Sequence, residues 1–219
     1  IVSNYVPDLI VFGHADLIDN KTIEFIKINY PDTKMCQWFL DRMDGEWKSN
    51  KDRFIKKMHL MDANFCTTDP NSLNFNKKYH TYYMPNCVDP SLEKLRIYNN
   101  NFYKSDVFFA MSHGVHRGEL KSGKKDDREI FINNLIKKNR NLKFDVYGMN
   151  NVQPIWADQF INKISNSYMG INLSRGKPIK YYSSDRMAQI VGNGLLTFID
   201  KKTCLSDFFS NNEIIFYNN

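Results

Sequence analysis

Short apolar runs alternate with amphipathic segments along most of the chain. Residues 9–12 and 34–41 have the length and apolar content of buried strands. Residues 50–61 instead place Phe54 and Met58 four positions apart, as one face of a helix requires. Strands that alternate with helices of this length predict βαβ units and therefore parallel sheets.

The pattern predicts strands at residues 6–14, 34–41, 63–68, 80–88, 106–112, 143–148, 168–174, 195–200 and 213–217. It predicts helices at residues 21–28, 50–61, 126–138, 157–165, 185–191 and 205–209. Residues 91–105 are polar, rich in Asn and Tyr, and only weakly periodic. We therefore expect a connector at 91–105 between two α/β domains, at 1–90 and 106–219.

Residues 168–200 combine a strand, a polar loop, a helix and a second strand. Ser183 or Ser184 is placed to cap the helix, because a hydroxyl can accept a hydrogen bond from a first-turn N–H group. Gly194 tolerates the left-handed conformation that commonly ends a helix. With Arg186 in the first turn, the helix start predicts an anion site, and phosphate is the first ligand to consider.

Composition places the chain among folded proteins, since 42% of its 219 residues are hydrophobic and 25% are charged. No apolar run reaches the ~18 residues of a membrane helix. The net charge of +6 permits an acidic ligand or an anionic membrane surface. The basic run at 121–125 is followed at once by Asp126 and Asp127, so we interpret it as a solvated loop and not as a nucleic-acid contact.

The four cysteines lie far apart and form no CxxC pair, which argues against a zinc site. Free thiols in a reducing cytoplasm are the favoured interpretation, with disulfides as the alternative. The sequence begins at Ile1, without Met or a signal peptide, so we expect a fragment whose targeting segment could lie outside it.

In open α/β sheets, ligands bind at the carboxyl ends of the strands. This rule selects loops in which polar and glycine residues gather, namely 13–16, 41–44, 67–69, 112–118, 148–153, 174–180 and 200–201.

Four motifs in the second half are similar to the nucleotide-sugar-binding domain of GT-B glycosyltransferases: FFAMSHGVHRGEL, KFDVYG, YMGINLSRG and SSDRMAQIVGNGLL. The nearest resemblance is to bacterial enzymes of the spore-coat maturation type. The first half resembles the later strands of the amino-terminal domain, in PDLIVFGH, KMCQWFLD, ANFCTTD and YYMPNCVDP. The resemblance implies two Rossmann-like domains whose parallel sheets face a cleft, with the amino-terminal, acceptor-side domain incomplete and the carboxyl-terminal domain binding the donor.

The resemblance also assigns candidate donor residues. The diphosphate would be bound by Ser112, Gly114, Arg117, Lys177, Ser183, Ser184 and Arg186. The nucleoside would be bound by Tyr147, Gly148 and Gln189. Gln189 departs from the family, which usually has a ribose-binding glutamate there; an amide still bonds to hydroxyls but removes the charge. Gly148 has a tight turn as its alternative role. No bound metal and no cofactor are expected.

His14 and Asp41 each end a predicted strand and are the candidate catalytic bases. A histidine with an ordinary pKa near ~6.5 suits proton removal from an acceptor hydroxyl. Asp16, Arg42 and Asp44 lie beside them in the same two loops. The sequence does not separate His14 from Asp41, and a structural hydrogen bond is the alternative role for the histidine.

The expected function is transfer of a sugar from a nucleoside diphosphate donor to a hydroxyl of a glycan or lipid-linked glycan. We expect the protein in the cytoplasm. Peripheral association with the inner face of a membrane is left open. Three alternatives stay open: a non-catalytic nucleotide-sugar-binding protein, a sugar-nucleotide epimerase of the same architecture and, with least support, a nucleic-acid-binding protein.

Overall fold

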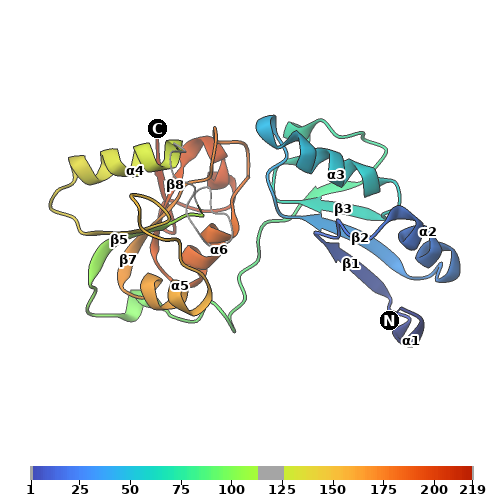
Figure 1. The fold of residues 1–219 in the computed structure, drawn as a ribbon, viewed down its shortest axis with the longest axis horizontal. Coiled ribbons are helices and arrows are strands. Elements are labelled where there is room, and N and C mark those ends of the chain that lie inside the picture. The colour runs from blue at the N-terminus through green and yellow to red at the C-terminus, as the bar shows by residue number, and fades with distance from the viewer. Residues whose placement is uncertain (1, 113–125, 219) are drawn as a thin grey trace. The chain divides into compact units, whose positions relative to one another are not determined.

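The computed structural model describes residues 2–112 and 126–218, which form two compact units (Figure 1). Unit 1 comprises Ile1–Asn86 together with Ile179–Ser184, and unit 2 comprises Cys87–Pro178 together with Asp185–Asn219. Each unit is built around its own parallel sheet. The α/β class expected from the alternating pattern is therefore confirmed, and both sheets have the Rossmann-like combination of parallel strands and flanking helices.

The sheet of unit 1 has four parallel strands in the order β1-β2-β3-β4. The strands are β1 (Leu9–Gly13), β2 (Lys34–Phe39), β3 (Ala63–Cys66) and β4 (Thr81–Tyr83). The helical elements are α1 (Val2–Tyr5), α2 (Asn20–Asn29), the 3-10 turns η1 (Gly45–Trp47) and η2 (Pro70–Leu73), and α3 (Lys48–Met58). Because the four neighbouring strands are parallel, all four carboxyl ends lie along one edge of this sheet.

Helices α2 and α3 each bury part of their apolar residues against the sheet. Ile23 of α2 packs with Phe12 and Met35, whereas Phe54 of α3 packs with Phe39. A buried amide pair ties the layers together, since Gln37 Nε2 donates to the side-chain oxygen of Asn64 at 2.6 Å and to the carbonyl of Phe54 at 3.1 Å. These buried polar groups are thus satisfied inside the core.

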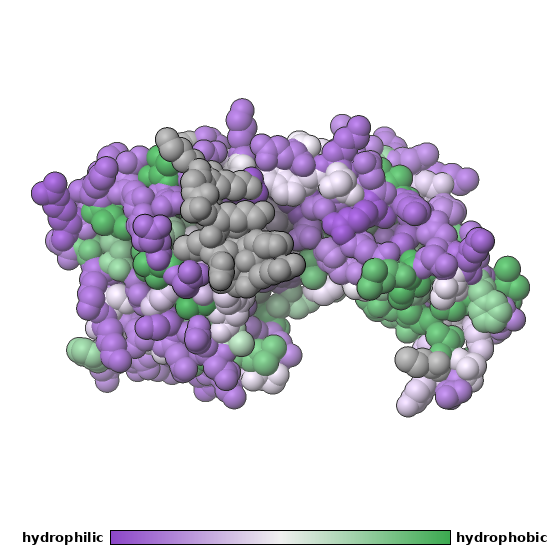
Figure 2. Space-filling model, in the orientation of Figure 1, coloured by the Kyte–Doolittle hydropathy of each residue, from purple (hydrophilic) through white to green (hydrophobic). Residues whose placement is uncertain are grey.

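Hydrophobic side chains also remain exposed on unit 1. Leu9 and Val11, which share one face of β1, are 55% and 54% exposed, and Phe25 and Ile28 of α2 are exposed as well. Figure 2 shows hydrophobic residues gathered around β1 and α2.

A short segment from the second half of the sequence completes unit 1. We call Ile179–Ser184 the returning segment. Ile179 packs on the core cluster that contains Phe39 and Phe54. The carbonyl of Lys180 accepts a hydrogen bond from the Asp69 N–H at 3.1 Å, and the carbonyl of Tyr181 accepts one from the Tyr83 hydroxyl at 3.3 Å.

The sheet of unit 2 has five parallel strands in the order β6-β5-β7-β8-β9. The strands are β5 (Ser105–Ala110), β6 (Phe144–Tyr147), β7 (Ser167–Asn172), β8 (Leu196–Asp200) and β9 (Ile215–Tyr217). The helical elements are η3 (Ile97–Asn99), α4 (Asp127–Lys138), α5 (Ala157–Ile164), α6 (Asp185–Gly192), η4 (Lys201–Thr203) and η5 (Leu205–Asp207). The chain runs from β5 to β6 on one side and then crosses to β7 on the other, so a topological switch point lies between β5 and β7.

Helices cover both faces of this sheet. Ile132 of α4 packs with Val107 and Phe109 on one face. On the other face, Ile164 of α5 and Ile190 of α6 pack with Phe108. This three-layer arrangement explains why β5 is almost continuously buried, as parallel strands covered on both faces are.

Each predicted strand has a counterpart, and most elements are one to three residues shorter at their ends, although the strand expected at 80–88 is only Thr81–Tyr83. The helix expected at 205–209 is the 3-10 turn η5. The segment 91–105 differs from its expected role as a polar connector, because Ile97 is fully buried in the core of unit 2. Ile97 is surrounded in the sequence by Asn and Tyr residues, so the hydrophobic periodicity gave no sign that it is buried.

Candidate active site

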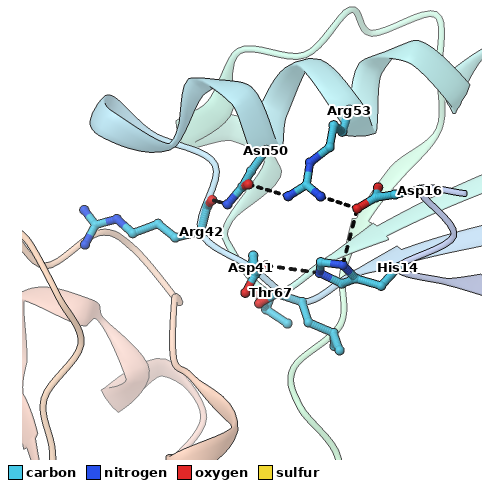
Figure 3. Close-up of polar contacts among 8 residues, drawn as sticks. His14, Asp16, Asp41, Arg42, Asn50, Arg53 and Thr67 are labelled. Atoms are coloured by element: carbon cyan, nitrogen blue, oxygen red, sulfur yellow. Dashed lines mark hydrogen bonds and ion pairs between the residues drawn. The ribbon is translucent and has the colours of Figure 1, made fainter. Parts of the chain in front are cut away.

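His14 lies directly after β1, at the carboxyl edge of the unit 1 sheet, and has a left-handed backbone with φ of +49°. Its ring stacks on Phe39 with centroids 4.7 Å apart. Its Nε2 atom is 3.2 Å from Oδ2 of Asp41, and its Nδ1 atom is 3.9 Å from Oδ2 of Asp16 (Figure 3). The structure therefore brings the two predicted catalytic candidates, His14 and Asp41, together.

A second layer of polar contacts holds this group from helix α3. The guanidinium of Arg53 pairs with Asp16 and also donates to the side-chain oxygen of Asn50 at 2.5 Å. The amide nitrogen of Asn50 donates to the carbonyl of Arg42 at 2.8 Å. These contacts connect the loops after β1 and β2 to one helix, as Figure 3 shows. The arrangement holds the Asp16 carboxylate, and it ties the backbone next to Asp41 to helix α3.

The chemistry available here is proton transfer. The shorter contact, at 3.2 Å, lets Asp41 accept a hydrogen bond from Nε2–H and orient the ring. An imidazole whose one nitrogen is held by a carboxylate can accept a proton at the other, and the nearby negative charge stabilises the imidazolium that results. His14 is about one third exposed, so the ring also reaches solvent.

In unit 2, Arg186 occupies the switch point between β5 and β7. Its Nε donates to the carbonyl of Ala110, the last residue of β5, at 2.7 Å. Its Nη1 donates to the carbonyl of Leu173, just after β7, at 3.0 Å. The guanidinium lies 5.3 Å from the ring centre of Phe109. The side chain thus joins the carboxyl ends of two strands and carries a positive charge to the place where open α/β sheets bind ligands.

Gly148 allows a close approach between two loops, a structural role that the sequence had left as an alternative to nucleoside binding. Its φ is +76°, and a Cβ atom there would lie 1.6 Å from the carbonyl oxygen of Met111. Only glycine allows this approach between the loops after β6 and β5. The neighbouring Tyr147 points into the core against Phe108 and Phe160, and burial, reinforced by Asp145, raises the pKa of its hydroxyl. A nucleoside contact from this turn would therefore come from backbone atoms.

Sequence reasoning missed Asn172, the last residue of β7. The side chain is 4% exposed, and its Oδ1 atom accepts no hydrogen bond within residues 2–112 and 126–218. An unsatisfied buried acceptor costs about 1–3 kcal/mol, which a ligand hydroxyl could relieve. The sequence signal that could have identified Asn172 is a polar residue at the carboxyl end of a strand. It directly precedes Leu173, whose carbonyl accepts a hydrogen bond from Arg186.

The other predicted donor residues lie in different surroundings. Ser112 is exposed just after β5, Lys177 is exposed in the loop after β7, and Gln189 is half-buried on α6. Gly114 and Arg117 lie outside the described residues. Ser183 and Ser184 belong to the returning segment of unit 1, and the carbonyl of Ser183 accepts a hydrogen bond from Asn86 at 3.4 Å. At the start of α6, Asp185 accepts a hydrogen bond from the N–H of Arg186 at 3.0 Å.

The comparisons with known proteins find one match, in the second half of the chain. A protein-family model described as "Glycosyl transferase-like" matches residues 126–219. The chain matches none of the curated proteins with which it was compared. The matched part includes β7, α6 and Arg186, so the similarity supports glycosyl transfer in general terms. The nearer resemblance to spore-coat maturation enzymes stays a prediction.

Two negative findings concern the described residues alone. No helix there is both long and apolar enough to cross a membrane. No group of three or more His, Cys, Asp or Glu side chains within 2–112 and 126–218 is arranged to hold a metal ion. The four cysteines, all within the described residues, form no disulfide bond with one another; Cys36 and Cys66 are buried, Cys87 is exposed and Cys204 is partly exposed.

Proposed function

We propose that the protein is a glycosyltransferase that takes a sugar from a nucleoside diphosphate donor and attaches it to a hydroxyl group of a glycan or lipid-linked glycan. The observation that carries this proposal is Arg186, whose guanidinium joins the carbonyls of Ala110 and Leu173 at the switch point of the sheet. This residue lies inside the region similar to the glycosyltransferase family.

In the proposed reaction, unit 2 binds the donor. Arg186 stabilises the negative charge that develops on the departing diphosphate, which is the main electrostatic requirement of metal-free sugar transfer. Ser112 and Lys177 of unit 2 assist it, as do Gly114 and Arg117 outside the described residues. Gln189 bonds to the ribose as donor and acceptor. The donor is a substrate, and no resident cofactor takes part.

Unit 1 supplies the base in the same proposal. Nδ1 of His14 accepts the proton of the acceptor hydroxyl while Asp41 holds Nε2–H and stabilises the imidazolium. The acceptor side then corresponds to residues 1–90 and the donor side to residues 106–219. The enzyme would work in the cytoplasm or at the inner face of a membrane.

Thermal-shift measurements with UDP, GDP, dTDP and ADP sugars test donor binding. We expect one nucleotide series to raise the melting temperature, because a ligand that binds only the folded state stabilises it. The Arg186→Lys variant keeps the charge but loses the guanidinium fork, and should weaken the shift. Arg140→Lys, an exposed arginine of the same unit, is the matched control. The absence of a shift with every nucleotide would reject the donor site.

The non-catalytic alternative is separated by a second measurement. The release of free nucleoside diphosphate from the nucleotide sugar that binds is measured with and without acceptor glycans. Turnover that falls about 10²–10³-fold in Arg186→Ala supports transfer, because removal of one transition-state donor typically costs that much. Donor binding with no hydrolysis and no transfer under any condition would favour a nucleotide-sugar-binding protein.

A further inference from the structure

Unit 1 has a pocket of about 490 Å³ on the side of α3 that faces η2. Its floor includes the buried side chains of Met43 and Leu73. Lys48 and Asp52 line it from α3, one turn apart on the same helix face. Asp44 lines it from the loop after β2. No residue of the His14 group lines this pocket, so it is a separate hollow.

The walls of this pocket are held in place by contacts of their own. Lys51 spans from α3 to η2, where its Nζ donates to the carbonyl of Leu73 at 2.5 Å. Asp44 is fixed by an ion pair with Arg42, whose side chain is buried and lies 4.6 Å from the ring centre of Trp47. Gly45 and Asn74, which both line the pocket, have a left-handed φ of +51°. A site built in this way is formed before a ligand arrives.

The lining offers both kinds of hydrogen-bonding group. Asp44 and Asp52 accept hydrogen bonds, and Lys48 donates them, above an apolar floor. The two carboxylates offset the positive charge of Lys48 and Lys51, so the pocket does not select simple anions. Hydroxyl groups need donors and acceptors together, and the carbon face of a sugar ring suits an apolar floor. The chemistry therefore fits a carbohydrate.

The pocket lies close to the candidate base. Asp41 contacts His14 and Asp44 lines the pocket, and the three residue steps between their Cα atoms span at most about 11 Å. Asn50 of α3 holds the intervening loop by its bond to the carbonyl of Arg42 (Figure 3). Because no described residue that contacts His14 lines the pocket, a sugar bound there leaves the imidazole to a different unit, and the span is short enough for one molecule to bridge.

We propose that this pocket binds a sugar unit of the acceptor other than the unit that carries the reacting hydroxyl, so that the acceptor is an oligosaccharide. This proposal rests on the proposed function. It gives the pocket a positioning role, because contacts to a remote part of the substrate bring the reacting hydroxyl to His14 and hold it there.

The test uses amide NMR spectra of the full chain, titrated with maltose, cellobiose, lactose and diacetylchitobiose. At least one disaccharide should shift the amide signals of Gly45 and Asn74. In Asp52→Asn and Lys48→Met, the same disaccharide should bind about tenfold more weakly, because a hydrogen bond to a charged group is lost. Lys56→Met, an exposed lysine of α3 outside the pocket, should leave binding unchanged.

The proposed sugar site would be contradicted if none of the four disaccharides shifts these amide signals, or if the shifts map elsewhere. It would also be contradicted if Asp52→Asn and Lys48→Met bind the disaccharide as tightly as the parent chain. Titration of the same samples with the nucleotide sugars reports on unit 2 independently. Nucleotide binding without disaccharide binding contradicts the pocket alone. Disaccharide binding without any nucleotide binding contradicts the donor site and leaves a carbohydrate-binding pocket that serves some other reaction.

Discussion

His14 lies between two carboxylates that reach it from different loops, Asp16 after β1 and Asp41 after β2. Both loops follow the carboxyl ends of parallel strands, where ligands bind in open α/β sheets. The sequence could therefore predict them as candidate site loops. The supporting contacts from Arg53 and Asn50 could not be predicted, because a helix surface carries many polar residues and only the tertiary structure shows which of them contact the neighbouring loops.

Replacement of His14 by alanine should lower the turnover of sugar transfer about 10²–10⁴-fold, the usual contribution of a general base. The affinity for the nucleotide sugar should stay the same, because the proposed donor site lies in unit 2 and His14 in unit 1. Steady-state kinetics and donor titration check both parts. His59→Ala, at an exposed position after α3, is the control. A turnover in His14→Ala equal to that of His59→Ala would show that His14 has only a structural role.

Gly148→Ala should destabilise the protein by about 2–5 kcal/mol, the sum of left-handed strain and overpacking. The added methyl group would collide with the backbone of Met111, which cannot move without disturbing β5. Urea unfolding measures the loss. Gly13→Ala is the matched control, because a Cβ atom there meets nothing within 4 Å. Equal stability of the two variants would contradict the close approach.

At the scale of elements, the order of strands and helices followed from periodicity because parallel strands buried on both faces form distinct apolar runs. The predicted ends of the elements were less accurate. A strand ends where its hydrogen-bonded pairing ends, and the sequence does not show that pairing. The 3-10 turns other than η5, and the buried anchor Ile97, were missed for a related reason. A single apolar residue among polar neighbours has no periodicity, and only its packing partners reveal that it is buried.

Burial of strand β3 has a chemical consequence for its last residue. Burial raises the pKa of the Cys66 thiol to about 12, whereas the ordinary value is 9.0. In the native protein at pH 8, a thiol reagent should therefore modify Cys87, which is exposed, and leave Cys66 unmodified until the chain unfolds. Because the folded state disfavours the thiolate, stability should fall as the pH rises from 9 toward 12, and Cys66→Ala should reduce that fall. Rapid native labelling of Cys66 would contradict its burial.

At the scale of the whole molecule, the division into two units does not follow a single point in the sequence. The sequence predicted two α/β domains separated by a connector, and the structure has two units. It did not predict that the returning segment belongs to unit 1. Ile179 and Lys180 looked like part of the polar loop after β7, and nothing local indicates a partner more than a hundred residues earlier.

Ile179→Ala should loosen unit 1 although the residue lies in the second half of the sequence. Loss of this packing should cost about 2 kcal/mol, at the low end for such a truncation because the side chain is only partly buried. Hydrogen exchange should accelerate in β2 and β3 and stay unchanged in β7 and β8. Ile161→Ala, partly buried in the core of unit 2, should give the opposite pattern. Faster exchange of β7 in Ile179→Ala would contradict the assignment of this segment.

The returning segment also bears on how the chain folds as it is made. Domains generally fold as units while the ribosome synthesises them from the amino terminus. Here Asn86 closes the first stretch of unit 1, but Ile179 and the backbone partners of Asp69 and Tyr83 emerge only after β5, β6 and β7 have been synthesised. Unit 1 must therefore wait, incompletely packed, through most of the synthesis of unit 2, and a ribosome that stalls in that interval would expose an unfinished core.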